Sequence, residues 1–284
     1  MIEMKSKKIL IFVFLIISTT LCAQKEYGIW EVKEGRVIGN DSANFSMAED
    51  YWQTIHHILP SDLIDKYIVS LRLFTDGIDK DMGGLNQMDK TVEYWQFDLD
   101  TEDMDLLTSD SIKILNYTHT LIHEFGHLLT LNSTQIELTD DNYQSEGKGY
   151  LTDEGYARKS SYLNLFVKQF WKPAILKEWD RINRKKNESK RIDFLYDFYL
   201  LRPNEFVTDY AAESPEEDIA ESWTFFVLTD KPLPTSIKYQ KLEFFYQFPE
   251  LIAYRELIRK RVKFIPNLYL ENYRNNDTSG KQKN

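Results

Sequence analysis

Two histidines four residues apart constrain this chain more than any other feature of its sequence. They belong to His123-Glu124-Phe125-Gly126-His127, within a stretch of helical hydrophobic spacing that runs from Asp110 or Ser111 to about Leu131. The buried stripe of this helix is expected to consist of Ile112, Leu115, Ile122, Phe125 and Leu129. Positions i and i+4 lie on the same face of a helix, so both imidazoles can reach one tetrahedral zinc ion. Glu124 lies beside that face, where it can reach a metal-bound water rather than the metal.

A catalytic zinc site usually takes three protein ligands, so a third one has to come from elsewhere. A histidine six residues after the second one, with glycine midway, is one solution, but those positions hold Ser133 and Thr130. The other histidines lie upstream, and His119 precedes His123 by one helical turn. We expect His119 to be a packed or hydrogen-bonding neighbour of the ligands. The third ligand is therefore expected to be a carboxylate on another helix.

The best candidate helix spans residues 215–228. Ser214 suits its N-cap, Pro215 suits its first position, and acidic residues follow in the first turn. Glu217 and Glu221 are four residues apart and share a face. One of the two can bind the metal while the other accepts the N–H of a ligating histidine. Asp218 also stays open as the ligand.

The two motifs together resemble a known family. The segment His123–His127, followed by Tyr210 and by Glu217-Asp218-Ile219-Ala220-Glu221, is similar to the gluzincin metallopeptidases. The similarity is to the anthrax lethal factor type in particular, where a Tyr precedes a Glu-x-x-Ala-Glu helix by the same interval. Two features depart from that pattern: ninety residues separate His127 from Glu217, and Asp218 stands where the family tends to carry an aromatic residue.

The resemblance implies a zincin-like fold, one Zn²⁺ per chain and a role for each residue of the motifs. The implied roles are zinc ligands for His123, His127 and Glu217, general base for Glu124, transition-state donor for Tyr210, and hydrogen-bond partner of a ligating histidine for Glu221.

The rest of the chain predicts an α+β fold, with a small N-terminal sheet, the site helix and a mainly helical C-terminal lobe. The helices are expected at 45–59, 153–179, 191–200, 215–228, 237–246 and 249–261. We expect a single domain over 24–271, with two lobes and a cleft near 132–150, followed by a flexible tail over 272–284.

Strands are expected at Tyr67–Phe74 and Thr91–Leu99, and Gly83-Gly84 is interpreted as a turn between them. Thr91–Leu99 is also the candidate edge strand along which an extended peptide could pair. The acidic stretch Asp98–Asp105 is interpreted as a solvated loop, and the basic run Arg181–Arg191 as a solvated turn between helices.

The N-terminus and the net charge bound the cellular context. Residues Met1–Ala23 show a basic start, a short apolar run and a small residue at the end, as secretory signal peptides do. Lipidation at Cys22, the only cysteine, is the alternative. The net charge of −10 argues against a nucleic-acid partner. We therefore expect a secreted, periplasmic or cell-surface protein with no membrane span.

These features together predict a secreted zinc-dependent peptidase that acts on polypeptides. Two alternatives stay open: an inactive binding protein that keeps a zincin fold, and a zinc amidase that acts on non-protein amides. An open groove would favour a polypeptide substrate, and a closed pit would favour a small one.

Overall fold

The computed structural model describes residues 25–39, 44–77 and 81–262. Within these ranges the chain has a mixed α+β architecture with a five-stranded sheet and nine α-helices. The expected signal peptide and the tail over 272–284 lie outside the described residues.

The sheet lies in the N-terminal half, in the strand order β2-β1-β3-β5-β4. Its strands are β1 (Lys25–Lys33), β2 (Arg36–Ile38), β3 (Ile68–Thr75), β4 (Gly83–Gln87) and β5 (Trp95–Asp100). β3 and β5 run parallel, whereas the other pairs are antiparallel. Because β5 lies between β3 and β4, the strand at the edge beside the site is β4.

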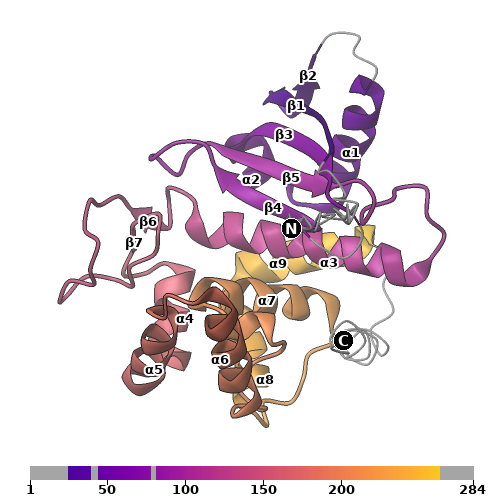
Figure 1. Cartoon of the computed structure of the whole chain (residues 1–284). Coiled ribbons are helices and arrows are strands. Elements are labelled where there is room, and N and C mark those ends of the chain that lie inside the picture. Colours follow the sequence, from indigo (N-terminus) through magenta and orange to yellow (C-terminus); the bar gives the residue numbers. More distant parts are fainter. Residues whose placement is uncertain (1–24, 40–43, 78–80, 263–284) are drawn as a thin grey trace, which may run out of the picture.

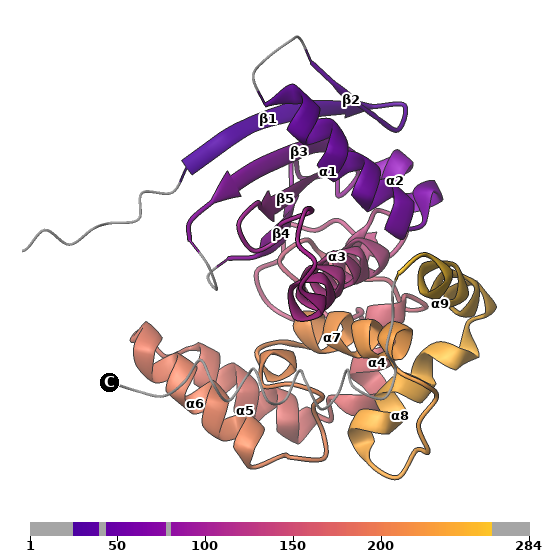
Figure 2. The same cartoon turned by 90° about the vertical axis from the view of Figure 1, so that its right-hand side faces the viewer.

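Three helices pack against this sheet: α1 (Phe45–Ile58), α2 (Ser61–Tyr67) and α3 (Ser111–Leu131). Figure 2 shows α1 and α2 on one face of the sheet and α3 below it, next to β4. α3 begins at Asp110, whose carboxylate accepts a hydrogen bond from the backbone N–H of Ile112 as an N-cap.

The C-terminal part is helical apart from the short pair β6 (Ile136–Glu137) and β7 (Tyr156–Ala157). Its helices are α4 (Tyr162–Phe170), α5 (Pro173–Asn183), α6 (Glu188–Leu200), α7 (Pro215–Leu228), α8 (Ile237–Phe244) and α9 (Pro249–Arg261), with 3₁₀ turns at Tyr210–Ala212 and Phe245–Gln247. None of the described helices combines the length and the apolarity that crossing a membrane would need.

α3 and α7 pack closely against each other at the centre of the molecule (Figure 1). Gly126 makes this approach possible, because a Cβ there would lie 3.1 Å from the Cα of Ala220 and 3.0 Å from the Trp223 ring. The far end of α7 is held by α9: Arg255 and Arg259 donate to its last carbonyl oxygens, which have no partner within the helix. The sheet half and the helical half therefore meet along α3 and α7.

Two expectations about the sheet are wrong. Gly83-Gly84 begins β4 rather than forming a turn. The two glycines pair with β5, where Gly83 lies so close to the backbone oxygen of Asp98 that a Cβ would crowd it. The strand expected at Thr91–Leu99 begins only at Trp95, and it is an inner strand rather than the edge. The edge therefore belongs to the segment that the sequence placed in a turn.

The acidic stretch Asp98–Asp105 is not a solvated loop. Asp98 lies within β5 and forms an ion pair with Arg72 at 2.9 Å, and buried Asp100 accepts the backbone N–H groups of Asp76 and Glu102. Carboxylates can be buried here because charge and backbone donors compensate for the lost water.

Two helix expectations also needed correction. The single helix expected over 153–179 is a strand, β7, followed by α4 and α5, which are separated at the Trp171–Pro173 corner. Ile112, expected in the buried stripe of α3, is exposed in the first turn of that helix.

Candidate metal centre

The two histidines of the site come from the buried face of α3. His123 and His127 lie one turn apart, and the side chain of His123 is almost completely buried. Glu217 reaches them from the first turn of α7, where Ser214 caps the helix by accepting the backbone N–H of Glu217. The cap and Pro215 at the first position fix where this turn begins, and thereby where the carboxylate lies.

Three donor atoms converge between the helices. Nε2 of His123 lies 3.0 Å from Nε2 of His127 and 3.0 Å from Oε2 of Glu217, and Nε2 of His127 lies 3.3 Å from the same oxygen. This His-x-x-x-His plus Glu group could hold a metal ion.

The separations fit a small tetrahedral cation. Ligands about 2.0–2.1 Å from a tetrahedral metal lie roughly 3.3 Å from one another, close to the spacings found here. Two imidazoles and one carboxylate are donors that first-row transition metals accept, whereas calcium takes six to eight oxygens. The residues present therefore fit a zinc-type ion.

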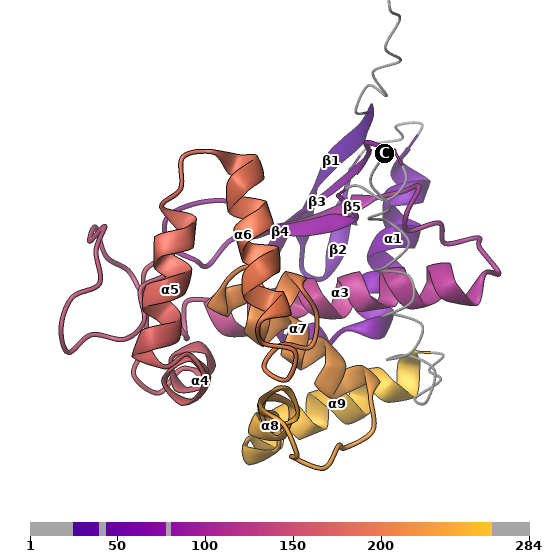
Figure 3. The same cartoon turned by 60° about the horizontal axis from the view of Figure 1, so that its bottom comes forward.

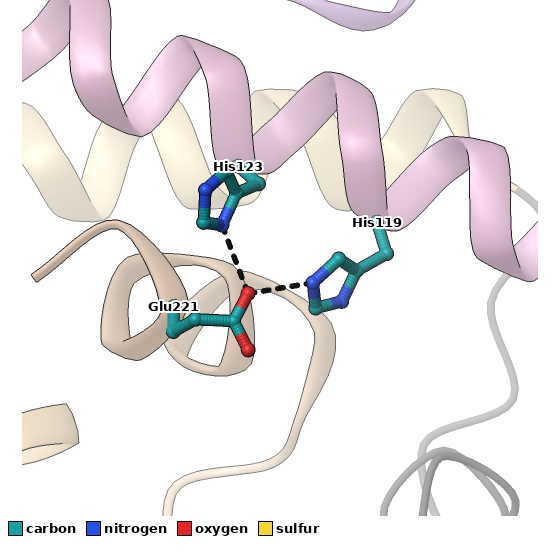
Figure 4. A group of neighbouring side chains, drawn as sticks. All are labelled: His119, His123 and Glu221. Carbon is teal, nitrogen blue, oxygen red and sulfur yellow. Dashed lines mark hydrogen bonds and ion pairs between the residues drawn. The ribbon is translucent and has the colours of Figure 1, made fainter. Parts of the chain in front are cut away.

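A second group behind the first is better explained by hydrogen bonds. Oε1 of Glu221 lies 2.7 Å from Nε2 of His119 and 2.8 Å from Nδ1 of His123 (Figure 4). Its Oε2 accepts the hydroxyl of Thr208 at 2.7 Å. These distances are shorter than ligands around one metal would allow, and they suit charge-assisted hydrogen bonds.

Glu221 therefore orients His123, one of the candidate ligands. By accepting the Nδ1–H of His123, it holds the ring so that Nε2 is directed at Glu217 and His127. His119 holds the same carboxylate oxygen from one turn earlier on α3. Figure 4 shows both rings pointing from α3 towards Glu221 on the helix below.

Burial and opposite charge together set the pKa values of the ligands. Burial disfavours the charged form of each group, but the hydrogen bonds that His123 donates to Glu217 and Glu221 hold the pKa of His123 well above its ordinary value. Against the same burial, His127 and His123 hold the pKa of Glu217 well below its ordinary value. Glu217 is therefore ionised at neutral pH, as a ligating carboxylate must be.

Glu124 and Tyr210 line the cleft described below, together with His127 and Glu217 of the metal group. Burial raises the pKa of Glu124, and the nearby His123, His127 and the backbone N–H of Leu85 on β4 offset part of the increase. A carboxylate with a raised pKa suits proton transfer near neutral pH.

Tyr210 lies beside the metal group, with its ring 5.6 Å from that of His123. Its side chain is 44% exposed. Partial burial and the carboxylates of Glu217 and Glu124 raise its pKa, so the phenol stays protonated and can donate a hydrogen bond.

Asp218, the remaining candidate ligand, points away from the histidines. It is fully buried and forms an ion pair with Lys241 of α8 at 2.6 Å, and it accepts the indole N–H of Trp171 at 2.8 Å. Burial raises the pKa of Asp218 to about 6 although the ammonium lies beside it. Among Glu217, Asp218 and Glu221, only Glu217 therefore lies with both histidines of the motif.

An open cleft of about 1090 Å³ leads to this group. It is lined by Gly83–Asn86 of β4, by loop residues 141–144 and 150–154, by α5 and α6, and by the start of α7. Figure 3 shows α5 and α6 as two adjacent helices that stand beside α7.

The sequence did not reveal two parts of this arrangement. Thr208, which holds Glu221, is a single residue with no spacing pattern to mark it. The β4 edge was hidden because its glycines favour a turn when only local sequence is considered.

Comparisons with descriptions of protein families, with curated proteins and with solved structures gave no significant match. The geometry of the site is therefore the ground for the functional proposal.

Proposed function

We propose that this protein is a secreted zinc-dependent peptidase of the gluzincin kind. The observation that carries the proposal is the convergence of His123, His127 and Glu217 within 3.0–3.3 Å of one another, beside Glu124 and at the floor of an open cleft. The zincin-like fold and the anthrax lethal factor type are part of this proposal.

Zinc, when bound, would lower the pKa of a water towards ~7 and polarise the carbonyl of the substrate. Glu124 would accept a proton from the attacking water at its carboxylate and pass that proton to the leaving amine, a contribution of about 10²–10⁴-fold. The phenol of Tyr210 would donate to the oxygen of the reacting carbonyl, which accelerates the reaction only as far as the donation strengthens in the transition state.

The shape of the cleft favours a polypeptide over a small amide. The cleft is open and extends past the metal group to β4, α5 and α6. β4 is an edge strand, so an extended peptide could add to it by backbone pairing. In this proposal β4 replaces Thr91–Leu99 as the strand that aligns the substrate.

Secretion rests on the signal-like Met1–Ala23 alone. In the producing cell, we expect the protein found outside the cytoplasm to begin at Gln24, as N-terminal sequencing of that fraction would show. A lipid on Cys22 would instead retain the protein at the membrane surface.

The test compares three forms of the chain from Gln24 onward: wild type, Glu124→Gln and Glu217→Ala. Metal content is measured by mass spectrometry, and activity against a mixed fluorogenic peptide library. We expect about one zinc per chain in wild type and in Glu124→Gln, with cleavage by wild type alone. Zinc without any cleavage would favour the inactive binding protein. A wild type without zinc, even after zinc addition, would overturn the proposal.

A further inference from the structure

The helical arm formed by α5 and α6 differs in charge from the rest of the chain. From Pro173 to Leu200 there are seven Lys or Arg and five Asp or Glu, a net charge of +2 in a chain whose total is −10, and all seven basic residues lie between Lys177 and Arg191. The turn expected within this basic run lies at residues 184–187, and the run continues into both helices. Positive charge concentrated on one part of an acidic chain can attract an acidic partner.

Part of this charge faces the cleft. Lys177, Arg184 and Arg191 line it. Arg184 pairs with Asp180 on the same helix at 2.7 Å, and Arg191 lies 3.8 Å from Glu188. Lys177 is exposed, and no carboxylate of the described residues forms an ion pair with it. Lys177 is therefore available to a ligand in the cleft, and an acidic side chain there could compete with Glu188 for Arg191.

The other lining of the cleft carries the opposite charge. Asp141, Asp153 and Glu154 line it from the loop side, and Glu213 and Glu216 from the start of α7. A uniformly charged polyanion such as a nucleic acid would meet these carboxylates as well as the arm. A peptide can instead place acidic side chains only where it faces the arm, because successive side chains of an extended chain point to opposite sides.

We propose that the α5–α6 arm selects polypeptide segments that carry acidic side chains where they face the arm in the cleft. This inference rests on the proposed function for the cleavage step, but the binding preference itself does not depend on zinc. Lys177 and Arg191 determine the preference, and the unpaired edge of β4 holds the peptide backbone.

The test uses three peptides of equal length that differ in having two Asp, two Asn or two Lys at the varied positions. Binding is measured by fluorescence anisotropy in the Glu124→Gln background, and kcat/KM in the active form. The cleft variant is Lys177→Glu with Arg191→Glu. The matched control is Lys172→Glu with Lys186→Glu, which makes the same charge change on exposed residues outside the cleft lining.

We expect the Asp peptide to bind tighter than the Asn peptide, and the ratio to fall about ten-fold in the cleft variant, as for two exposed charge pairs. The control should keep most of the ratio. Binding with this preference but without cleavage by the active form would keep the inference and overturn the proposed function.

Three results would overturn the inference while leaving the peptidase intact: cleavage that ignores the varied positions, an equal loss in the control, or tighter binding of a single-stranded oligonucleotide than of the Asp peptide. Failure of all three peptides to bind would overturn it as well.

Discussion

At the scale of single residues, one buried carboxylate organises the site. Glu221 is fully buried, and it accepts hydrogen bonds from His119, His123 and Thr208. A buried carboxylate is tolerated only when its oxygens are satisfied, so these donors are needed for stability and not only for orientation. The hydroxyl of Thr208 also accepts the backbone N–H of Ala211, beside Tyr210.

Removing either glutamate of α7 should affect the metal differently. We expect Glu217→Ala to abolish stoichiometric zinc, because it removes a ligand, whereas Glu221→Gln should weaken zinc binding about 10–100-fold. Competition with a chelating dye measures both affinities. Glu213→Gln, at a residue that lines the cleft and is not part of the metal group, is the control. Equal losses in Glu217→Ala and Glu213→Gln would contradict the assignment.

Thr208→Val should destabilise the fold. The substitution keeps the shape but leaves Oε2 of Glu221 and the backbone N–H of Ala211 without this partner, which costs about 1–3 kcal/mol. Urea unfolding followed by tryptophan fluorescence would measure the loss. Thr208→Ser keeps the hydroxyl and should recover most of it, and a Val variant as stable as the Ser variant would rule out the hydrogen-bonding role.

The site could be predicted in part because spacing is visible in a sequence and long-range contact is not. The four-residue intervals from His123 to His127 and from Glu217 to Glu221 are local, and they placed each pair on one helix face. The choice of Glu217 over Asp218 depended on how α7 is rotated against α3 and α8, which no local pattern encodes.

At the scale of elements, the distance between α3 and α7 decides whether their ligands meet. We expect Gly126→Ala to lower stability by up to about 2 kcal/mol. The new methyl group would crowd the backbone of Ala220, at a cost of about 1–3 kcal/mol, while the better helix propensity of alanine returns about 1 kcal/mol. Chemical denaturation checks the sign: a gain in stability would mean that the two helices separate without cost.

The buried ion pair between α7 and α8 makes a second prediction at this scale. Lys241→Met should cost about 3–5 kcal/mol, because Asp218 would be left as an unpaired buried charge. In the double variant with Asp218→Asn, the amide oxygen can still accept the indole N–H of Trp171, and most of the stability should return. A double variant no more stable than Lys241→Met would refute this account. The comparison is made by thermal unfolding.

The first residue of a helix can be predicted where the sequence carries a local start signal, such as proline at the first helical position. α7 begins at Pro215, as expected from proline at the first helical position, and α9 begins at Pro249, the first residue of its expected range. The same signal at Pro173 separates α4 from α5. For this reason the single helix expected over 153–179 is wrong. The strand order could not be predicted, because the insertion of β5 between β3 and β4 is a long-range pairing.

At the scale of the whole molecule, the ligands come from both halves of the chain, so a bound metal should stabilise their association. We expect chelation to lower Tm by roughly 10 °C, because a ligand at 1,000 times its Kd adds about 4 kcal/mol and each kcal/mol shifts Tm by about 2–4 °C at this size. Calorimetry with and without chelator measures the shift, and zinc should restore it. Glu217→Ala should show no shift, and a shift of equal size in that variant would assign the effect to another site.

The exposed loop between β6 and β7 divides the ligand set between two stretches of sequence. Residues 140–148 are exposed, His123 and His127 precede them, and Glu217 and Glu221 follow. Opening the chain there would give two polypeptides, each with an incomplete coordination sphere, that the β6–β7 pair and the α3–α7 contact could bring back together. If the proposed function holds, the protein is thus a natural starting point for a fragment-complementation pair whose reassembly would be read out by the recovery of metal binding.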